Sequence, residues 1–236
     1  MGRRAPSLRR KMENRRPGHS LTSPCGRSLS GLSLDVLYLA SRSPQRAMLL
    51  ERAGITFRVV DSTCDEEVVS FPNPQVLALE RARAKAAAAV LTADQRSVVP
   101  TVVLGADTVV ALGAQIFGKP NDRADAVRIL GLLQGTTHTV YTGHCCLRVD
   151  AGNHGEASRI AMARVTMLPM SQQDIESYVA SGESDGRAGA YAIQETGDRF
   201  VAELQGSWDT VIGLNVAMAA RLYCECTEAW PDGYRA

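Results

Sequence analysis

Apolar runs and helical patterns alternate along the first half of the sequence. Short apolar runs typical of buried strands occur at 36–40, 57–60 and 101–104. The third strand should end at 105–107, and 109–112 continues in extended form up to a turn at Gly113. A helix is expected to start after Ser43, with Pro44 at its first position, and to end at Gly54. A second helix, rich in alanine, is predicted over 75–91. The pattern therefore predicts strand–helix units in this half of the chain.

Extended patterns dominate the second half. After a cap at Asn121 and Asp122, apolar residues with helical spacing predict a helix at 123–133. Two long extended stretches, 137–149 and 157–168, are joined by a turn at 151–155. The remaining predicted elements are a helix from Ser171 to Tyr178, short strands at 199–204 and 208–213, and a last helix at 214–223. This order predicts an α/β fold with a mixed twisted sheet and flanking helices.

The composition along the chain predicts which residues form the folded domain. The chain has 236 residues, of which 45% are hydrophobic and 22% charged, so it can bury a proper core. We expect one domain at 34–228 and a short C-terminal tail at 229–236. Residues 1–33 form a basic segment, which we interpret as a disordered tail or as the product of an early start codon, although an organelle transit peptide is an alternative. Its basic residues are Arg3, Arg4, Arg9, Arg10, Lys11, Arg15, Arg16 and Arg27.

Charge and cysteine content exclude several classes of protein. The formal net charge of +1 gives no overall attraction to nucleic acid or to an anionic membrane. No apolar run approaches the roughly 20 residues of a membrane-spanning helix. The six cysteines form no Cys-x-x-Cys pair, and no histidine cluster completes a zinc site. We expect reduced thiols in a cytoplasmic protein that binds neither nucleic acid nor membrane.

Four short segments can carry chemistry. The segment 41–46 places Ser41, Gln45 and Arg46 at a helix N-terminus, which suits a phosphate group. The segment 105–108 places Asp107 after a predicted buried strand, where a carboxylate can hold Mg²⁺ or accept a proton from water. Each segment also has an ordinary interpretation, as a helix cap and as a turn aspartate.

The other two segments are 118–120 and 187–194. Lys119 follows a glycine that permits close backbone approach, so its ammonium group can contact a phosphate. Gln194 ends a run of small residues, and its amide can both donate to and accept from a nucleobase edge. A solvated surface turn and a core strand are the ordinary interpretations. None of the four segments is specific by itself.

Their order and spacing resemble those of the Maf family, also called septum formation inhibitor-like proteins. The resemblance covers about residues 35–218. The matching stretches are 39–46, 65–66, 84–86, 105–110, 118–120, 138–143, 178–183, 188–194 and 206–207.

The resemblance implies an elongated, two-lobed domain with a central cleft, usually a homodimer. It also implies hydrolysis of a nucleoside triphosphate to its monophosphate and pyrophosphate, with Mg²⁺ or Mn²⁺. Asp107 would then be the proton acceptor, and Asp107 and Glu66 would hold the metal. The remaining expected triphosphate contacts are Ser41, Arg46, Lys85 and Lys119.

Base preference rests on three positions. Thr108 and Gln194 resemble the branch that acts on dTTP and UTP, and so does the run 138–143. Gln45 departs from the family pattern, because the dTTP/UTP branch has Arg there and the 7-methyl-GTP branch has Trp. Two further departures are Arg187 in place of Lys, and Asn215 in place of Pro.

Three alternatives stay open at this stage. The first is a house-cleaning pyrophosphatase for other non-canonical nucleotides, which Gln45 favours. The second is a non-catalytic nucleotide-binding regulator of cell division, against which Asp107, Lys119 and Glu66 argue. The third is a nucleic-acid binder that uses the basic tail, but this tail has no interleaved aromatic residues. The preferred base, the metal and the oligomeric state do not follow from the sequence.

Overall fold

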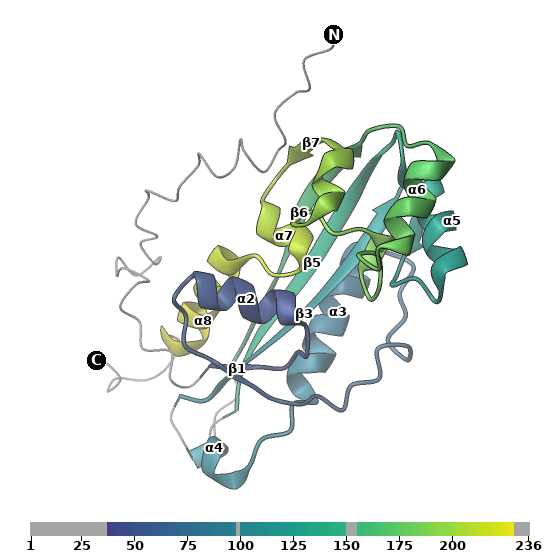
Figure 1. Cartoon of the computed structure of the whole chain (residues 1–236). Helices are drawn as coiled ribbons and strands as arrows, with labels where there is room; N and C mark the ends of the chain where they lie inside the picture. Colours follow the sequence, from purple (N-terminus) through teal and green to yellow (C-terminus); the bar gives the residue numbers. More distant parts are fainter. Residues whose placement is uncertain (1–36, 98–99, 150–154, 229–236) are drawn as a thin grey trace. The chain divides into compact units, whose positions relative to one another are not determined.

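The computed structural model describes residues 37–97, 100–149 and 155–228 (Figure 1). These residues form two compact units. One, which we call the terminal unit, contains the described residues of 37–108, 142–161 and 213–228. The other, which we call the central unit, contains 109–141 and 162–212. The predicted tails at 1–33 and 229–236, and most of the turn at 151–155, lie outside the described residues.

The terminal unit combines short parallel strands with four helices. Its strands β1 (Leu37–Leu39) and β2 (Arg58–Val59) pair in parallel, and β1 also pairs in parallel with β3 (Val102–Leu112). The helices are α2 (Pro44–Arg52), α3 (Pro74–Ala87), α4 (Ala93–Ser97) and α8 (Val216–Glu228). Three long strands, β3, β5 (Thr137–Arg148) and β6 (Glu156–Met167), contribute residues to both units.

The central unit contains antiparallel pairs and short helices. Strand β4 (Gln115–Phe117) pairs antiparallel with β3, and β7 (Val201–Gln205) pairs antiparallel with β6. Its helices are α5 (Arg123–Leu133), α6 (Gln172–Ala180), α7 (Trp208–Ile212) and the 3₁₀ segments η2 (Ala188–Ala190) and η3 (Thr196–Phe200). Among the described residues the sheet has the order β2-β1-β3-β5-β6-β7, with β4 beside β3. The predicted mixed sheet with flanking helices is confirmed.

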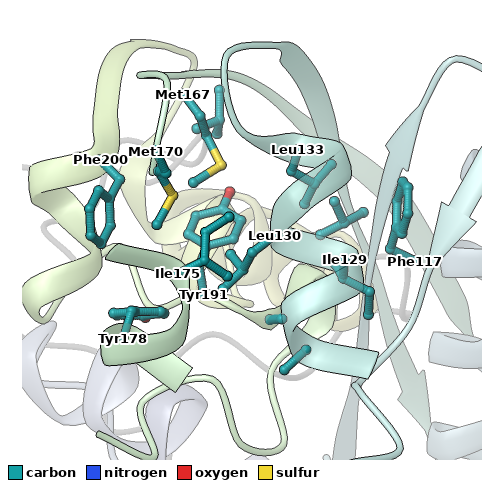
Figure 2. Close-up of a cluster of buried hydrophobic side chains, with 14 of the residues drawn as sticks. Phe117, Ile129, Leu130, Leu133, Met167, Met170, Ile175, Tyr178, Tyr191 and Phe200 are labelled. Carbon is teal, nitrogen blue, oxygen red and sulfur yellow. The ribbon is translucent and has the colours of Figure 1, made fainter. Parts of the chain in front are cut away.

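The core of the central unit lies against α5 and α6, which pack on each other (Figure 2). Helix α5 contributes Ile129, Leu130 and Leu133, which have the helical spacing expected from the sequence. Both helices begin as predicted: the Asp122 side chain accepts from the backbone N–H of residue 125, and Ser171 forms a capping box with its third helical residue. The caps satisfy backbone groups that the helix itself leaves unpaired.

In the terminal unit, helix α3 packs directly on the strands at two glycines. A Cβ atom placed on Gly105 would lie 2.2 Å from the carbonyl oxygen of Ala82, and one on Gly143 would lie 2.2 Å from that of Ala78. Only glycine allows the helix backbone to come this close. The strand residues beside these glycines therefore lie within reach of the α3 side chains.

Several predicted boundaries are wrong. The predicted extended region up to 112 is confirmed, but the expected end of the strand at 105–107 is wrong, because β3 runs unbroken from Val102 to Leu112 and contains Asp107. The segment 208–213 contains the helix α7 rather than a strand, and 187–194 contains η2 and turns rather than a core strand. Helix α3 ends at Ala87, since the chain then turns to form a bridge between Ser62 and Ala89. The last helix, α8, is longer than predicted and begins at Val216.

Four short elements of three to five residues were not expected: β4, α4, η2 and η3. Such short segments carry too few residues for a periodic pattern. Among the described helices, none has the length and hydropathy needed to cross a bilayer.

Candidate functional site

A lysine in helix α3 is shared by two carboxylates of the terminal unit. The Nζ atom of Lys85 lies 2.6 Å from Oδ1 of Asp107 and 2.9 Å from Oε1 of Glu66. Lys85 and Asp107 are buried, at 7% and 5% exposure, whereas Glu66 is half-exposed at the edge of a loop. The approach of α3 to β3 at Gly105 explains the contact, because Gly105 and Asp107 share one face of the strand. Three predicted site residues are thus brought together.

Asp107 keeps one carboxylate oxygen for another partner. Its Oδ2 atom is buried and has no hydrogen-bond partner among the described residues. A buried polar atom left unpaired is costly, so this oxygen needs a partner such as a water molecule or a ligand. Because Mg²⁺ is held by one or two carboxylates together with substrate phosphates and water, Asp107 and Glu66 fit the expected cation. Within the described residues, no cluster of three or more metal-ligating side chains occurs, so these carboxylates alone would not complete a coordination shell.

Helix α2 supplies a buried arginine to the other face of β3. Thr108 follows Asp107, and successive side chains of a strand point to opposite faces, so Thr108 faces α2. Arg46, 8% exposed, donates from Nε to the carbonyl oxygen of Gly213 at 2.8 Å and from Nη1 to Oγ of Ser41 at 2.9 Å. A longer contact of 3.4 Å joins its Nη2 to Oγ1 of Thr108. These contacts use three of the five N–H donors of the guanidinium group, which leaves two for a ligand.

The charge of Arg46 is affected by its surroundings. Burial lowers the pKa of Arg46, and the negative charges of Asp107 and Glu66 act in the opposite direction. Both carboxylates therefore belong to the electrostatic environment of the arginine as well as to that of Lys85. The site combines two buried cations with two carboxylates, an arrangement suited to a metal-bound polyphosphate.

The start of helix α2 is arranged differently from the prediction. Ser43 is the N-cap residue, but its side chain makes no capping hydrogen bond to the helix backbone. Instead, its hydroxyl donates to Oε1 of Gln45 at 3.1 Å. Oγ of Ser41 accepts from the Ser43 backbone N–H at 3.3 Å, besides accepting from Arg46. Ser41, Gln45 and Arg46 thus occupy one turn, as expected.

Thr108 is held by a second hydroxyl. Its Oγ1 atom lies 3.1 Å from Oγ1 of Thr142, a fully buried residue on β5. Thr108 itself is half-buried. Seven of the nine predicted site residues therefore lie in the terminal unit: Ser41, Gln45, Arg46, Glu66, Lys85, Asp107 and Thr108.

Lys119 and Gln194 belong to the central unit. Lys119 is exposed, and the carbonyl of the preceding Gly118 accepts from the backbone N–H of Gly189 at 3.1 Å. This bond ties the turn before Lys119 to the segment that leads to Gln194. Ala190 in that segment has φ of 60°, a left-handed conformation that costs energy for a residue with a Cβ.

Buried side chains hold the segment that carries Gln194. Oη of Tyr178 accepts from the backbone N–H of Ala192 at 2.8 Å. The Tyr191 hydroxyl pairs with Nε2 of His138 at 2.9 Å, and both side chains are buried. His138 is therefore part of the core of the central unit, although it lies in one of the stretches that the sequence singled out. Gln194 itself is half-buried.

Comparisons with known proteins identify the family of this chain. The sequence model described as Maf-like protein matches residues 36–226. This chain belongs to the Maf-like family. A protein of Synechococcus sp. (strain JA-3-3Ab) named nucleoside triphosphate pyrophosphatase is 39% identical over 84% of this chain and 99% of its own. Two proteins named dTTP/UTP pyrophosphatase, from Anaeromyxobacter dehalogenans and Moorella thermoacetica, are each 40% identical, over 79% and 80% of this chain and 91% and 94% of their own.

Two contacts of this Maf-like chain were missed by the sequence reasoning. The carbonyl of Gly213 accepts a hydrogen bond from Arg46. Gly213 lies within the range of the family resemblance but belongs to none of the matching stretches. His144 contacts the same segment, since its Nε2 accepts from the backbone N–H of Asn215 at 2.8 Å. A backbone carbonyl cannot be recognised from a sequence. Asn215, in contrast, can be recognised because it stands where the family pattern has Pro.

Proposed function

We propose that this Maf-like protein is a nucleoside triphosphate pyrophosphatase that hydrolyses dTTP and UTP to the monophosphate and pyrophosphate. The observation that carries the proposal is the buried Asp107, with one oxygen paired to Lys85 and the other free of protein partners among the described residues. This oxygen is buried beside a fixed ammonium group and accepts from no described protein group, so it can accept from a bound water molecule. The names of the relatives support the same reaction class.

Each site residue has a different part in the proposed reaction. In the proposed reaction, a water oxygen bonds to the α-phosphorus, the bond from this phosphorus to the bridging oxygen breaks, and pyrophosphate leaves. Asp107 takes the proton of the water on Oδ2, while Lys85 keeps the other oxygen fixed. Arg46 and Lys119 bind the phosphate oxygens and stabilise the charge that collects on the leaving group.

Asp107 and Glu66 would hold a divalent cation, Mg²⁺ or Mn²⁺. Such a cation, when bound, neutralises phosphate charge and lowers the pKa of a water ligand. The two carboxylates match its preference for oxygen ligands, and the triphosphate would complete its coordination.

The base preference rests on Thr108, Gln194 and Gln45. Gln194 can pair with a pyrimidine edge through its amide, because it offers both a donor and an acceptor. Gln45 can also pair with a base, but without charge, and its Oε1 already accepts from Ser43. This engagement of Gln45 favours a second candidate function, a pyrophosphatase for modified or non-canonical nucleotides.

The test is a substrate panel with product analysis. The purified chain is incubated with Mg²⁺ or Mn²⁺ and with dTTP, UTP, CTP, their 5-methyl forms, 7-methyl-GTP, ITP and the common purine nucleotides. Pyrophosphate together with the matching monophosphate, formed fastest from dTTP or UTP, is the expected result. Faster turnover of another nucleotide would support the second candidate. A folded chain that binds nucleotides but hydrolyses none would contradict both and favour a regulator.

A further inference from the structure

The segment 213–215 of the terminal unit holds Arg46 from the side opposite to Ser41. The Gly213 carbonyl accepts from Nε of Arg46 at 2.8 Å, which is the shortest contact of that guanidinium group. Gly213 has φ of 128°, a conformation that residues with a Cβ rarely adopt. A Cβ here would also lie 3.3 Å from Oγ1 of Thr108. The carbonyl can therefore point at Arg46 only while this turn keeps its shape.

Asn215 fixes the C-terminal end of the turn. Its Oδ1 accepts from the backbone N–H of Met218 at 3.0 Å, and its carbonyl accepts from that of Ala219 at 2.9 Å. These bonds make Asn215 the cap of helix α8. The fully buried side chain of Leu214, between Gly213 and Asn215, anchors the turn further.

His144 on strand β5 fixes the turn through the backbone of Asn215. Its ring is fully buried, and Nε2 accepts from the Asn215 N–H at 2.8 Å. The ring must be neutral to accept this bond. Burial, and then the positive charge of Arg46, lower the pKa of His144 to about 3, while contacts with the backbone of Arg159 and Thr142 act against this shift. Nε2 therefore stays an acceptor at neutral pH.

We propose that His144 and the Asn215 N–H are positioning groups for Arg46. The chain of contacts runs from the His144 ring to the Asn215 N–H, through the backbone of Leu214 to the Gly213 carbonyl, and from there to Nε of Arg46. His144 does not touch the substrate. It fixes the direction in which Arg46 presents its two remaining Nη donors to the triphosphate. This inference rests on the proposed function for the role of Arg46.

The experiment measures binding of inorganic tripolyphosphate by calorimetry, in the presence of Mg²⁺, and pyrophosphate release from dTTP in parallel. His144→Leu removes the acceptor and keeps most of the volume, whereas His144→Gln supplies an amide oxygen near the position of Nε2. We expect His144→Leu to weaken tripolyphosphate binding about five- to tenfold, the value of one neutral hydrogen bond. His144→Gln should restore most of this loss, and KM for dTTP should rise more than kcat falls.

A double-mutant cycle separates positioning from a general loss of structure. Arg46→Lys keeps the charge but has no Nε to meet the Gly213 carbonyl, so adding His144→Leu to it should cause no further loss of tripolyphosphate binding. Equal losses in both backgrounds would contradict the inference. So would parent-like binding by His144→Leu, or a parent chain that does not bind tripolyphosphate.

If His144→Leu does not fold, two variants of Asn215 test the same inference. Asn215→Ala loses the side-chain cap but keeps the N–H, whereas Asn215→Pro loses both. Weaker tripolyphosphate binding by the Pro variant than by the Ala variant supports the role of the N–H, and equal binding contradicts it. Absence of pyrophosphate release, with the binding pattern intact, would instead reject the proposed reaction and leave the positioning of Arg46 standing.

Discussion

Asp107 occupies a position where each of its oxygens has a different environment. One oxygen contacts Lys85 at 2.6 Å, and the other is buried without a hydrogen-bond partner among the described residues. The first contact fixes the carboxylate, and in the proposed reaction the second oxygen would accept a proton or bind a cation. A buried carboxylate oxygen that no described protein group pairs needs a water molecule or a ligand as its partner.

Asp107→Asn tests this role. The amide keeps the shape of the side chain but is not a useful proton acceptor. Pyrophosphate release should fall by about 10²- to 10⁴-fold, the usual contribution of a general base, while nucleotide binding persists. Stopped assays of pyrophosphate and equilibrium binding of a non-hydrolysable nucleotide measure the two quantities. Turnover close to that of the parent would remove Asp107 from its assigned role.

Gln45 is the second residue whose role can be measured directly. It lies in the turn that carries Ser41 and Arg46, and its carbonyl accepts from Ser43. Gln45→Arg would add a charged donor, and a charged hydrogen bond contributes about 1.5–3 kcal/mol. We expect kcat/KM for dTTP to rise by roughly ten- to hundredfold relative to that for ITP. An unchanged ratio would show that residue 45 does not contact the base.

Among the elements, the contact of α3 with β3 decides the geometry of the site. Lys85 lies one helical turn beyond Ala82, whose carbonyl touches the backbone of Gly105, and Asp107 lies two residues beyond that glycine. The sequence reasoning interpreted this glycine as part of a turn after a strand. Its real function in the fold, a close helix–strand contact, depends on a partner 23 residues away in the chain and has no local pattern.

Gly105→Ala should therefore disturb both the fold and the site. The new Cβ would meet the Ala82 carbonyl, which can move only if the whole helix moves. We expect a loss of about 1–3 kcal/mol in the free energy of unfolding, as for other overpacked cores, and a fall in turnover because α3 carries Lys85. Urea denaturation gives the first value.

Gly131→Ala is the matched control. Gly131 lies in helix α5, and a Cβ atom placed on it would meet no neighbouring atom within 4 Å. Alanine there should raise the free energy of unfolding by about 0.5–1 kcal/mol, since it favours the helix. Similar losses in the free energy of unfolding for Gly105→Ala and Gly131→Ala would mean that the close contact of Gly105 with Ala82 does not cause the loss.

At the scale of the whole molecule, two buried histidines link stability to pH. Burial lowers the pKa of His138 to about 4, and burial together with Arg46 lowers that of His144 to about 3. Unfolding returns both to about 6.5, so the unfolded chain binds more protons as the pH falls below that value. Stability from this source is complete above about pH 6.5 and is lost as the pH falls toward 4.

Urea denaturation between pH 7.5 and 5 measures this dependence. Each histidine should contribute on the order of 1 kcal/mol per pH unit below 6.5. His138→Gln, which can still bond to Tyr191, should show a shallower slope than the parent over the same range. Identical slopes would show that folding does not lower the pKa of His138.

Much of the whole fold could be predicted because its long elements carry strong patterns. Helices α5 and α6 have sequence-encoded caps and apolar faces, and the paired strands β5 and β6 were expected with nearly the observed bounds. The strand predicted at 208–213 is wrong, because the five residues of α7 are too few to show a helical spacing of apolar positions. In the site, the resemblance to the Maf family singled out Glu66, Lys85 and Asp107, which the structure brings together, whereas nothing in the sequence marked the carbonyl of Gly213.

The two ion pairs of Lys85 affect the stability of the protein when neither metal nor nucleotide is bound. The ammonium group already serves as an internal counter-ion for Asp107 and Glu66, so the two carboxylates do not depend on an external cation to coexist. A chelator should therefore abolish pyrophosphate release yet change the Tm by less than about 2 °C, unlike its effect on a protein folded around a structural metal. A large drop in Tm would mean that the fold itself needs the cation. Because the Lys85 ammonium group balances both carboxylates, we expect the chain to fold without metal or nucleotide.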